Sequence, residues 1–399
     1  MSLELKKFNC NISIALLLLI LNNYLLISLG IFNIVLKINL ILFFLSIVYF
    51  YFKNFKNNFT LKIYFLLFLL ICLGTAAKGW DLRSLYLFHA KRIFFDQSLY
   101  SLADNYAPFS HNDYPLLFHS FSASFAFLSG YWHEVFPKSA YTFVYLPPII
   151  FLSSYMSDKK YMILLSLLIF FIGTHLFLGG LDGVVALYFV TVGFCFFKIF
   201  FSGFEEEDNN IFFFITFLLC IILSLIKNEG MALLILIFIT TVFIKIFEKR
   251  ILIDSGKLIV LFFSFIPIIM WKIFCYKNGI TNTDFNLELL KINLINRLLI
   301  IDSYFLFFKY LIFSNEKSVI ALLFFITSFY LNFDKKLFSF VILLFLFYLL
   351  LLLIVYFSTP YELTYHLETS ANRVLKSFTF LLAFFSLYNL NIRSFSKTS

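Results

Sequence analysis

Charged residues are scarce in this chain: Asp, Glu, Lys and Arg make up 13% of its 399 residues, against 62% hydrophobic residues. Soluble globular domains carry roughly a quarter charged residues, so this composition and a mean hydropathy of +0.94 exclude an ordinary soluble protein. Apolar runs of roughly 16–22 residues recur from end to end, and a helix that spans a bilayer needs about 20. The chain is therefore predicted to be an all-α integral membrane protein.

Cysteine motifs and a cleavable leader are also absent. The five cysteines lie in or at the ends of apolar runs, without CxxC or CxxH spacing, which argues against a disulfide framework and a zinc site. The first apolar run lacks a small-residue cleavage site, so we interpret it as an uncleaved span. The net charge of +9 comes from basic residues in short loops between spans, as the positive-inside rule expects. Nucleic acid is therefore not an expected partner.

About twelve spans are predicted, with both termini in the cytoplasm, because all basic connectors then share one side. The spans are expected near residues 10–30, 32–52, 62–77, 139–156, 161–178, 184–201, 211–226, 231–247, 258–276, 318–333, 337–357 and 374–390. Segments 116–135 and 288–313 break this count. As juxtamembrane helices they keep the charge pattern, whereas either one alone as a span would invert the sidedness of the spans after it.

We interpret residues 1–399 as one polytopic membrane domain without a separate soluble domain. Three segments outside the spans are predicted to stand out within it. Residues 78–135 are expected to form an external loop with juxtamembrane helices, residues 277–313 an interfacial segment, and residues 358–373 an external polar loop or helix.

The densest polar cluster is TPYELTYHLETSANR, residues 359–373, which lies between two apolar segments. A capping box from Thr359 to Glu362 predicts that a helix begins at Thr359. On such a helix Glu362, His366 and Arg373 share one face, because they are spaced by four and seven residues. This places a carboxylate, an imidazole and a guanidinium together at a membrane boundary.

The outer-face loop 78–115 is the longest polar segment. Asp81 directly follows the third span, and an ionisable residue at the water–lipid boundary is a functional candidate; a loop acid or a helix cap is the alternative. Lys91 follows on a short helix, where it either binds phosphate or meets lipid headgroups.

The sequence HNDYP closes this loop and brings three further candidates, His111, Asp113 and Tyr114. Pro115 is expected to start the next helix. Asp113 is then either the cap of that helix or a second acid of the site.

Two shorter polar interruptions are expected on the same outer face. Asp182 lies in GGLDG, where glycines allow close backbone approach, and it either faces a polar cavity or caps the next helix. Lys227 and Glu229 interrupt an apolar stretch in the sequence KNEG, either as site residues or as a simple ion pair.

These acids and cations suit transfer from a lipid that bears a phosphate. A carboxylate can take the proton of an acceptor hydroxyl as general base. Arg and Lys can hold the phosphate and stabilise the charge that grows on it as the glycosidic bond breaks.

In these motifs the sequence resembles bacterial polytopic glycosyltransferases of the GT-C superfamily, which use polyprenyl-phosphate sugars as donors. The resemblance rests on five segments in order: GWDLRSLYLFHAK, HNDYPLL, GGLDG, IKNEG and TPYELTYHLETSANR. The chain departs from many relatives in having two spans before the first loop and no large C-terminal soluble domain.

The resemblance implies a multi-pass protein of the bacterial inner membrane whose active site faces the periplasm. Asp81 corresponds to the acid of the first external loop, which serves as base, and Asp182 to that of the second. His366 and Arg373 match the late polar stretch expected to contact donor phosphate. The expected partners are a polyprenyl-phosphate sugar, a glycan or lipid acceptor and membrane lipids, and direct displacement predicts inversion at the anomeric carbon.

Two other classes compete. A transporter or flippase of lipid-linked oligosaccharides would spread polar residues through the bilayer, whereas here they crowd at one face. An O-antigen polymerase or ligase also has a large outer loop, but its arginine-rich external loops are absent. The scattered Asp residues leave open whether a divalent cation takes part, and neither sugar nor acceptor can be named.

Overall fold

The computed structural model is all-helical over the residues that it describes, which are 3–53, 59–156, 158–173, 180–202, 209–248, 251–281, 287–313 and 315–396. The helices are α1 (Leu3–Ser28), α2 (Ile34–Phe52), α3 (Phe59–Gly74), α4 (Leu87–Asp96), α5 (Leu117–Ser129), α6 (Val135–Val144), α7 (Leu146–Ser153), α8 (Lys159–Gly173), α9 (Asp182–Phe201), α10 (Asn209–Ile226), α11 (Asn228–Phe247), α12 (Ile251–Phe262), α13 (Ile266–Lys277), α14 (Leu287–Leu298), α15 (Ile301–Phe308), α16 (Glu316–Leu331), α17 (Lys335–Ser358) and α18 (Leu363–Ser396). The predicted all-α fold class is confirmed for this part of the chain.

Eight helical segments in the described residues are long and apolar enough to cross a membrane. They are Glu4–Ser28, Ile34–Phe52, Val135–Ser153, Asp182–Phe201, Asn228–Phe247, Ser255–Lys277, Lys335–Ser358 and Leu363–Arg393. Two further predicted spans, in α3 and α10, form apolar helices that are shorter. The span predicted at residues 161–178 overlaps α8, which ends at Gly173, and residues 174–178 lie outside the described residues. A ninth candidate would combine Ile301–Leu311 with Glu316–Leu331, but these helices are bent by 79° relative to each other. The protein is therefore a multi-pass membrane protein in its composition and helix lengths.

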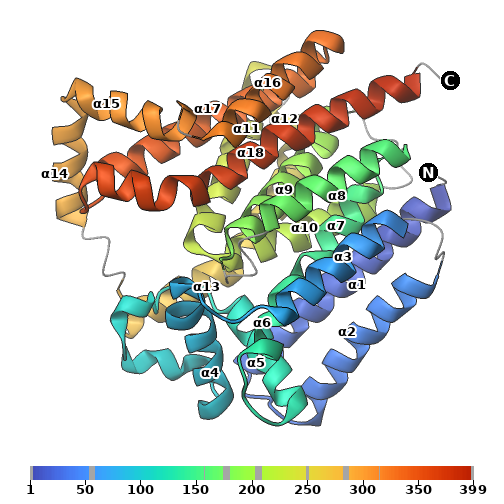
Figure 1. Ribbon diagram of the computed structural model, residues 1–399, viewed down its shortest axis with the longest axis vertical. Helices are drawn as coiled ribbons and strands as arrows, with labels where there is room; N and C mark the ends of the chain where they lie inside the picture. Colours follow the sequence, from blue (N-terminus) through green and yellow to red (C-terminus); the bar gives the residue numbers. More distant parts are fainter. Residues whose placement is uncertain are drawn as a thin grey trace.

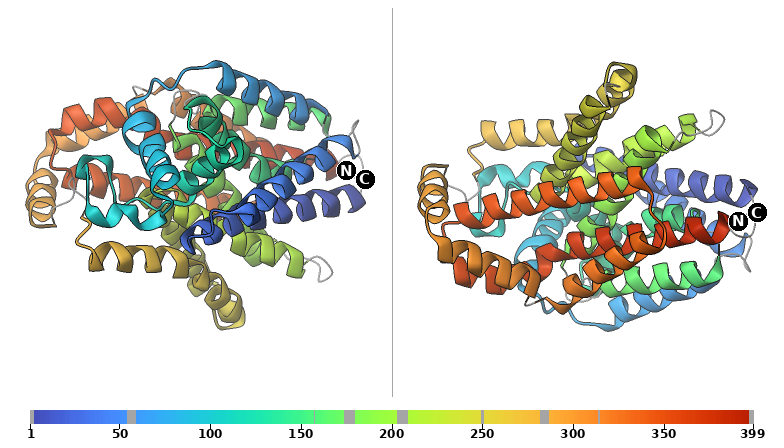
Figure 2. Two further views of the ribbon diagram at one scale, coloured as in Figure 1. Left: turned by 90° about the horizontal axis from the view of Figure 1, so that it is seen from below. Right: turned by 90° about the horizontal axis from the view of Figure 1, so that it is seen from above.

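The long helices run side by side as a bundle (Figure 1). The two chain termini lie together at one end, and all three ribbon views agree on this (Figures 1 and 2). The opposite end carries α4, α14 and α15. We call it the site end, and the end with the termini the terminal end.

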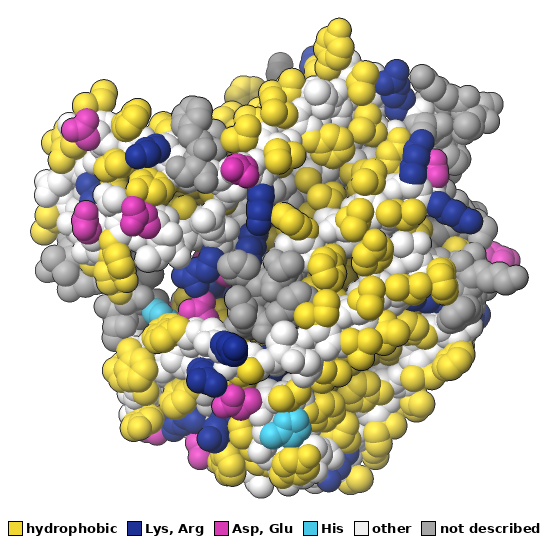
Figure 3. All heavy atoms as spheres, in the orientation of Figure 1, with side chains coloured by type: hydrophobic (Ala, Val, Ile, Leu, Met, Phe, Trp, Pro, Cys, Tyr) yellow, Lys and Arg dark blue, Asp and Glu magenta, His cyan; other side chains and the backbone are white. Residues whose placement is uncertain are grey.

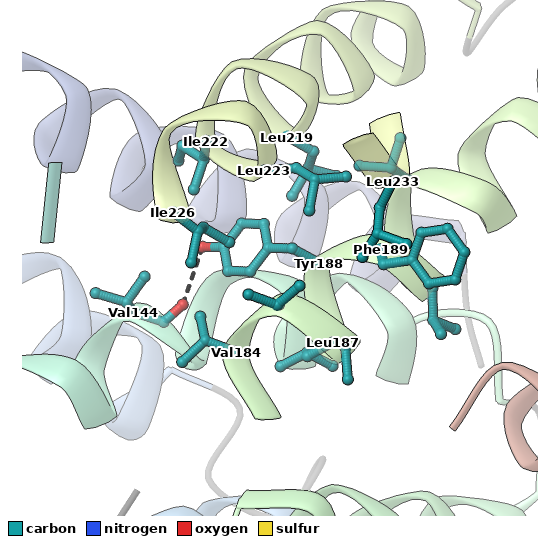
Figure 4. Close-up of a cluster of buried hydrophobic side chains, with 14 of the residues drawn as sticks. Val144, Val184, Leu187, Tyr188, Phe189, Leu219, Ile222, Leu223, Ile226 and Leu233 are labelled. Atoms are coloured by element: carbon teal, nitrogen blue, oxygen red, sulfur yellow. Dashed lines mark hydrogen bonds between the residues drawn. The ribbon is translucent and has the colours of Figure 1, made fainter. Parts of the chain in front are cut away.

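Helix α9 forms the centre of the bundle. Of the residues in its most apolar stretch, 94% are buried inside the protein, whereas only 28% of those in α17 are, although α17 is the more apolar helix. Tyr188 of α9 donates a hydrogen bond to the carbonyl of Val144 at 2.9 Å, among leucines and isoleucines of α10 (Figure 4). An apolar helix that exposes its side chains needs lipid to cover them. The yellow band between charged side chains at both ends of the molecule in Figure 3 is the surface that lipid would cover.

Helix α5 differs from the interfacial helix expected within segment 116–135. Its side chains from Leu117 to Phe127 are all buried, and it packs against α1, α4 and α6. Its serines are accommodated because Ser120 and Ser124 donate to carbonyls one turn back and Ser122 to the carbonyl of Pro137. Protein, not lipid headgroups, surrounds this helix.

Helices α14 and α15 form an arm at the site end, within the segment predicted as interfacial. The arm exposes apolar side chains at its bend, with Leu299 and Ile301 each 83% exposed. Arg297 ties it to the bundle by donating to the carbonyls of Tyr356 and Thr359, at 3.1 and 2.9 Å, and of Tyr361 at 2.7 Å. Residues 282–286 of this segment lie outside the described residues.

The predicted helix start at Thr359 is wrong by one turn. Helix α17 continues to Ser358, Thr359 follows as its C-terminal capping residue, and α18 begins at Leu363. Arg297 donates to the carbonyls of Thr359 and Tyr361 at this junction, and the chain bends at residues 360–361 instead of forming a first helical turn. His366 donates its backbone N–H to the carbonyl of Glu362 at 3.0 Å, which keeps the expected spacing from Glu362 onward.

Candidate functional site

The outer loop folds around two polar side chains of α4. Arg92 donates to both carboxylate oxygens of Asp104, at 2.6 and 3.0 Å, and to the carbonyl of Ser101. The buried His89 donates from Nε2 to the carbonyl of Ser110 at 2.8 Å. Burial lowers the pKa of His89 to about 4, so the ring is neutral at physiological pH. These bonds hold the loop over the site end of the bundle.

Asp81 pairs with Arg373 across 292 residues of sequence. Arg373 Nη1 lies 2.6 Å from Asp81 Oδ2, and the two side chains are 37% and 26% exposed. Asp81 immediately precedes a π-helical turn, Leu82–Tyr86, and Arg373 lies on α18. Two residues that the sequence predicted for one site, one as base and one as phosphate ligand, are thus in direct contact.

Lys227 joins the second predicted acid to the third polar motif. Its ammonium lies 3.2 Å from Asp182 Oδ1 and 3.2 Å from a carboxylate oxygen of Glu229. Lys227 and Asp182 are 8% and 12% exposed, so this is a buried ion pair, whereas Glu229 reaches solvent. The Lys227–Glu229 pairing considered from sequence is present, but Asp182 is part of it.

Glycines let the helices that carry this ion pair begin close to their neighbours. A Cβ on Gly183 would lie 2.5 Å from the carbonyl oxygen of Ile172, and one on Gly230 would overlap that of Leu223. No side chain fits there, so α9 and α11 both begin in close contact with the preceding helix. The expectation of close backbone approach in GGLDG is confirmed at Gly183.

Asp113 belongs to a third cluster. Its carboxylate accepts hydrogen bonds from Asn228 at 2.7 Å and from Lys272 at 3.2 Å. Its backbone carbonyl accepts from the Trp271 indole and from Lys272, both at 3.0 Å. The next helix begins at Leu117 without a side-chain cap, so Asp113 is not the cap that the sequence allowed.

These clusters adjoin one another. Asn228, which contacts Asp113, comes directly after Lys227 in the chain, and the Lys227 ammonium lies 5.9 Å from the ring centroid of Tyr114. His111 stacks on Tyr114 with ring centroids 5.0 Å apart. Of the predicted residues His111, Asp113 and Tyr114, it is therefore Tyr114 that lies against Lys227, while His111 and Asp113 contact its neighbours Tyr114 and Asn228.

Tyr86 is buried within reach of the charges of the first two ion pairs, and its hydroxyl has no hydrogen-bond partner among the described residues. It is fully buried in the loop that starts at Asp81. Burial raises the pKa of its phenol well above the usual value; Lys227 lowers this pKa, while Asp182 and Asp81 raise it further. Its hydroxyl therefore lies in the field of both pairs, although no pattern in the sequence singles out this tyrosine.

Three other predicted residues lie outside these ion pairs. His366 packs against the rings of Tyr356 and Tyr361, with centroids 4.9 and 5.9 Å away. Glu362 is exposed at the start of α18, and Lys91 is exposed on α4. Their predicted roles as phosphate ligands or supporting residues stay predictions.

Two lysines near the site were not among the residues predicted from the sequence. Lys272 interrupts the apolar run IPIIMWKIFCYK, and Lys376 follows Arg373 by three residues in α18. An ionisable residue inside a membrane helix is costly and marks a functional candidate, so their position was the signal that could have found them. The Lys376 ammonium is buried and has no hydrogen-bond partner in the described structure.

The question of a divalent cation stays open. Over the described ranges no three His, Cys, Asp or Glu side chains come together in a metal-binding arrangement. Asp81, Asp113 and Asp182 each contact a Lys or Arg instead.

Comparisons with known proteins found no match to this chain among protein-family models, curated proteins or solved structures. The site must therefore be interpreted from its own chemistry. Carboxylates and cations lie at one end of a membrane bundle, partly open to solvent and partly buried. Such a site can accept a proton and hold an anion.

Proposed function

We propose that this protein is a membrane glycosyltransferase of the GT-C type. In this proposal it moves a sugar from a polyprenyl phosphate to an acceptor hydroxyl at the periplasmic face of the bacterial inner membrane. The observation that carries the proposal is the contact between Asp81 and Arg373. In such a transfer one sugar ring connects the attacking hydroxyl and the leaving phosphate. The base and the guanidinium that binds the phosphate must therefore lie no farther apart than about the length of one sugar residue.

The proposed chemistry is a single displacement. The acceptor hydroxyl attacks the anomeric carbon and gives its proton to Asp81, while the bond between this carbon and the phosphate oxygen breaks. The electron pair leaves with the prenyl phosphate, whose charge Arg373 and nearby lysines stabilise. Attack opposite the leaving group inverts the anomeric configuration.

Asp81 is a better candidate for the base than Asp113 or Asp182. Asp81 is partly exposed. The sequence predicts it at the membrane boundary, where a water-borne acceptor and a lipid-borne donor can meet. The carboxylates of Asp182 and Asp113 are more buried and are each held by a lysine, so an acceptor hydroxyl reaches them less easily. They support the site by placing Lys227, Asn228 and the outer loop.

The test is transfer of labelled sugar from a polyprenyl-phosphate donor by membranes that contain each variant at equal abundance. Asp81→Asn keeps the shape of the side chain but cannot accept the proton, so transfer should fall about 10²–10⁴-fold. Asp302→Asn, an exposed acid of α15 at the same end, is the matched control and should transfer at the wild-type rate.

Wild-type transfer by Asp81→Asn would reject Asp81 as base. A product with retained anomeric configuration would reject single displacement. If the wild-type protein transfers no sugar but moves lipid-linked sugars across the bilayer, a transporter would be favoured instead.

A further inference from the structure

The cations at the site differ in whether they already have an anion. Arg373 is paired with Asp81, Lys227 with Asp182 and Glu229, and Lys272 with Asp113. Lys376 has no such partner: its ammonium is shielded from solvent and makes no hydrogen bond with any residue in the described ranges. A buried charge without a partner is strongly unfavourable, so an anion from outside the protein would be stabilised there.

Lys376 and Arg373 are three residues apart on α18, which puts them on one face of the helix. The Arg373 side chain is 37% exposed, whereas the Lys376 ammonium is shielded from solvent, and Arg373 lies nearer the start of the helix at the site end. An anion that enters past Arg373 would therefore reach Lys376 one turn deeper.

Three cations and one carboxylate act on Lys376, and the carboxylate has the largest effect of the four. Its charge is opposed by those of Lys317, Arg373 and Lys227, and Asp182 is the carboxylate that acts on it. Asp182 already accepts from Lys227 through Oδ1.

The first turn of α16 lies beside Lys376 and supplies Lys317, one of these cations. It packs along α18 on both sides of Lys376, through Asn315 to Asn372 at 3.1 Å and Ser318 to Thr379 at 3.2 Å. This turn carries Glu316 beside Lys317, so its side chains bring one charge of each sign close to Lys376.

We infer that Arg373 and Lys376 together bind the phosphate of a prenyl lipid, and that this phosphate competes with Asp81 for Arg373. Before the donor binds, Arg373 holds the Asp81 carboxylate. When the phosphate takes over Arg373, Asp81 is left free to accept a proton. The donor thus activates the base, and the inference rests on the proposed function for the identity of the lipid.

This competition makes an unusual prediction for binding. Asp81→Asn removes the competitor of the phosphate, so a variant that cannot act as base should bind the donor phosphate more tightly. Lys376→Met removes the unpaired ammonium and should weaken binding. The same variant should melt at a higher temperature, because a buried unpaired charge is replaced by an apolar side chain of similar length.

The experiment is equilibrium binding of polyprenyl phosphate to the purified full-length protein in lipid nanodiscs. We expect Lys376→Met to weaken binding about tenfold or more, and Asp81→Asn to strengthen it roughly three- to tenfold. Lys277→Met, an exposed lysine at the end of α13, is the matched control and should bind as the wild type. Polyprenol without phosphate should not compete.

Inorganic phosphate is the second probe. The same pattern across the variants with either ligand supports the anion site, and the tighter ligand identifies whether a lipid or a free phosphate is its source. Unchanged binding by Lys376→Met, or unchanged or weaker binding by Asp81→Asn, would overturn the inference.

The two proposals fail separately. The expected binding pattern in a protein that transfers no sugar would keep the anion site and reject the transferase. If the protein transfers sugar but all variants bind polyprenyl phosphate equally well, the transferase proposal is kept and the anion site is rejected.

Discussion

At the scale of single residues, the three acids of the site have different environments and therefore different expected roles. Asp81 is partly exposed and holds one guanidinium, whereas the carboxylate of Asp113 is fixed by Asn228 and Lys272. Asp113 is only 6% exposed. A buried carboxylate with these hydrogen bonds is expected to stabilise the fold.

We expect Asp113→Ala to destabilise the protein by about 1–3 kcal/mol, because it leaves Lys272 with fewer acceptors in a partly buried place. Its effect on transfer, measured per folded molecule, should be small beside that of Asp81→Asn. Thermal unfolding in detergent measures the first quantity and the labelled-sugar assay the second. Asp96→Ala is the control, since Asp96 is a surface acid 3.6 Å from Arg92.

The reverse pattern would contradict this assignment. If Asp113→Ala unfolds at the wild-type temperature and yet loses transfer, then Asp113 is a second acid of the reaction.

At the scale of elements, the arm of α14 and α15 positions the start of α18. Asn293 and Arg297 of α14 both donate to the carbonyl of Thr359, and Arg297 also reaches those of Tyr356 and Tyr361. The last carbonyls of a helix have no partner within it, so a guanidinium with several donors is well suited to satisfy them. The arm therefore determines where α18 begins and, through it, where Arg373 lies.

We expect Arg297→Ala to free the carbonyls at this junction and loosen residues 359–366. The free energy of unfolding should fall by about 1–3 kcal/mol, because these carbonyl oxygens lose their hydrogen-bond donor. Hydrogen exchange followed by mass spectrometry should show faster exchange in this segment, and sugar transfer should fall with it.

Lys291→Ala provides the comparison, since Lys291 is an exposed cation on the same helix. Equal exchange at residues 359–366 in both variants would show that the arm does not position this turn.

At the scale of the whole molecule, the structure brings both termini to one end and the candidate site to the other (Figures 1 and 2). The basic loops predict that the terminal end is cytoplasmic. The five native cysteines are all buried, so a cysteine introduced at an exposed position can be labelled selectively.

We expect Ala103→Cys, in the outer loop, to react with a membrane-impermeant thiol reagent in intact cells. Lys335→Cys, at the start of α17, should react only after the membrane is opened. Both positions are exposed in the structure. Labelling of residue 103 only from the cytoplasmic side would reverse the sidedness and remove the periplasmic site.

The sequence by itself determined the membrane class, most helix positions and the residues worth testing. Long apolar runs predict helices directly, because inside a bilayer the backbone N–H and C=O groups can form hydrogen bonds only with each other. The polar motifs at span boundaries identified Asp81, Asp182, Lys227 and Arg373, since charge in such places is costly and rarely incidental. The capping box at Thr359 failed because a distant arginine holds the carbonyls at that junction.

Only the tertiary structure decided which charge faces which. Asp81 and Arg373 are 292 residues apart, and Asp113 meets Lys272 across 159. Such contacts depend on the rotation and depth of packed helices, which local spacing does not encode. The same packing leaves the Lys376 ammonium without a hydrogen-bond partner among the described residues, one turn from Arg373. Sequence spacing alone does not distinguish a cation that is paired with a carboxylate of the protein from one that is available to bind a ligand.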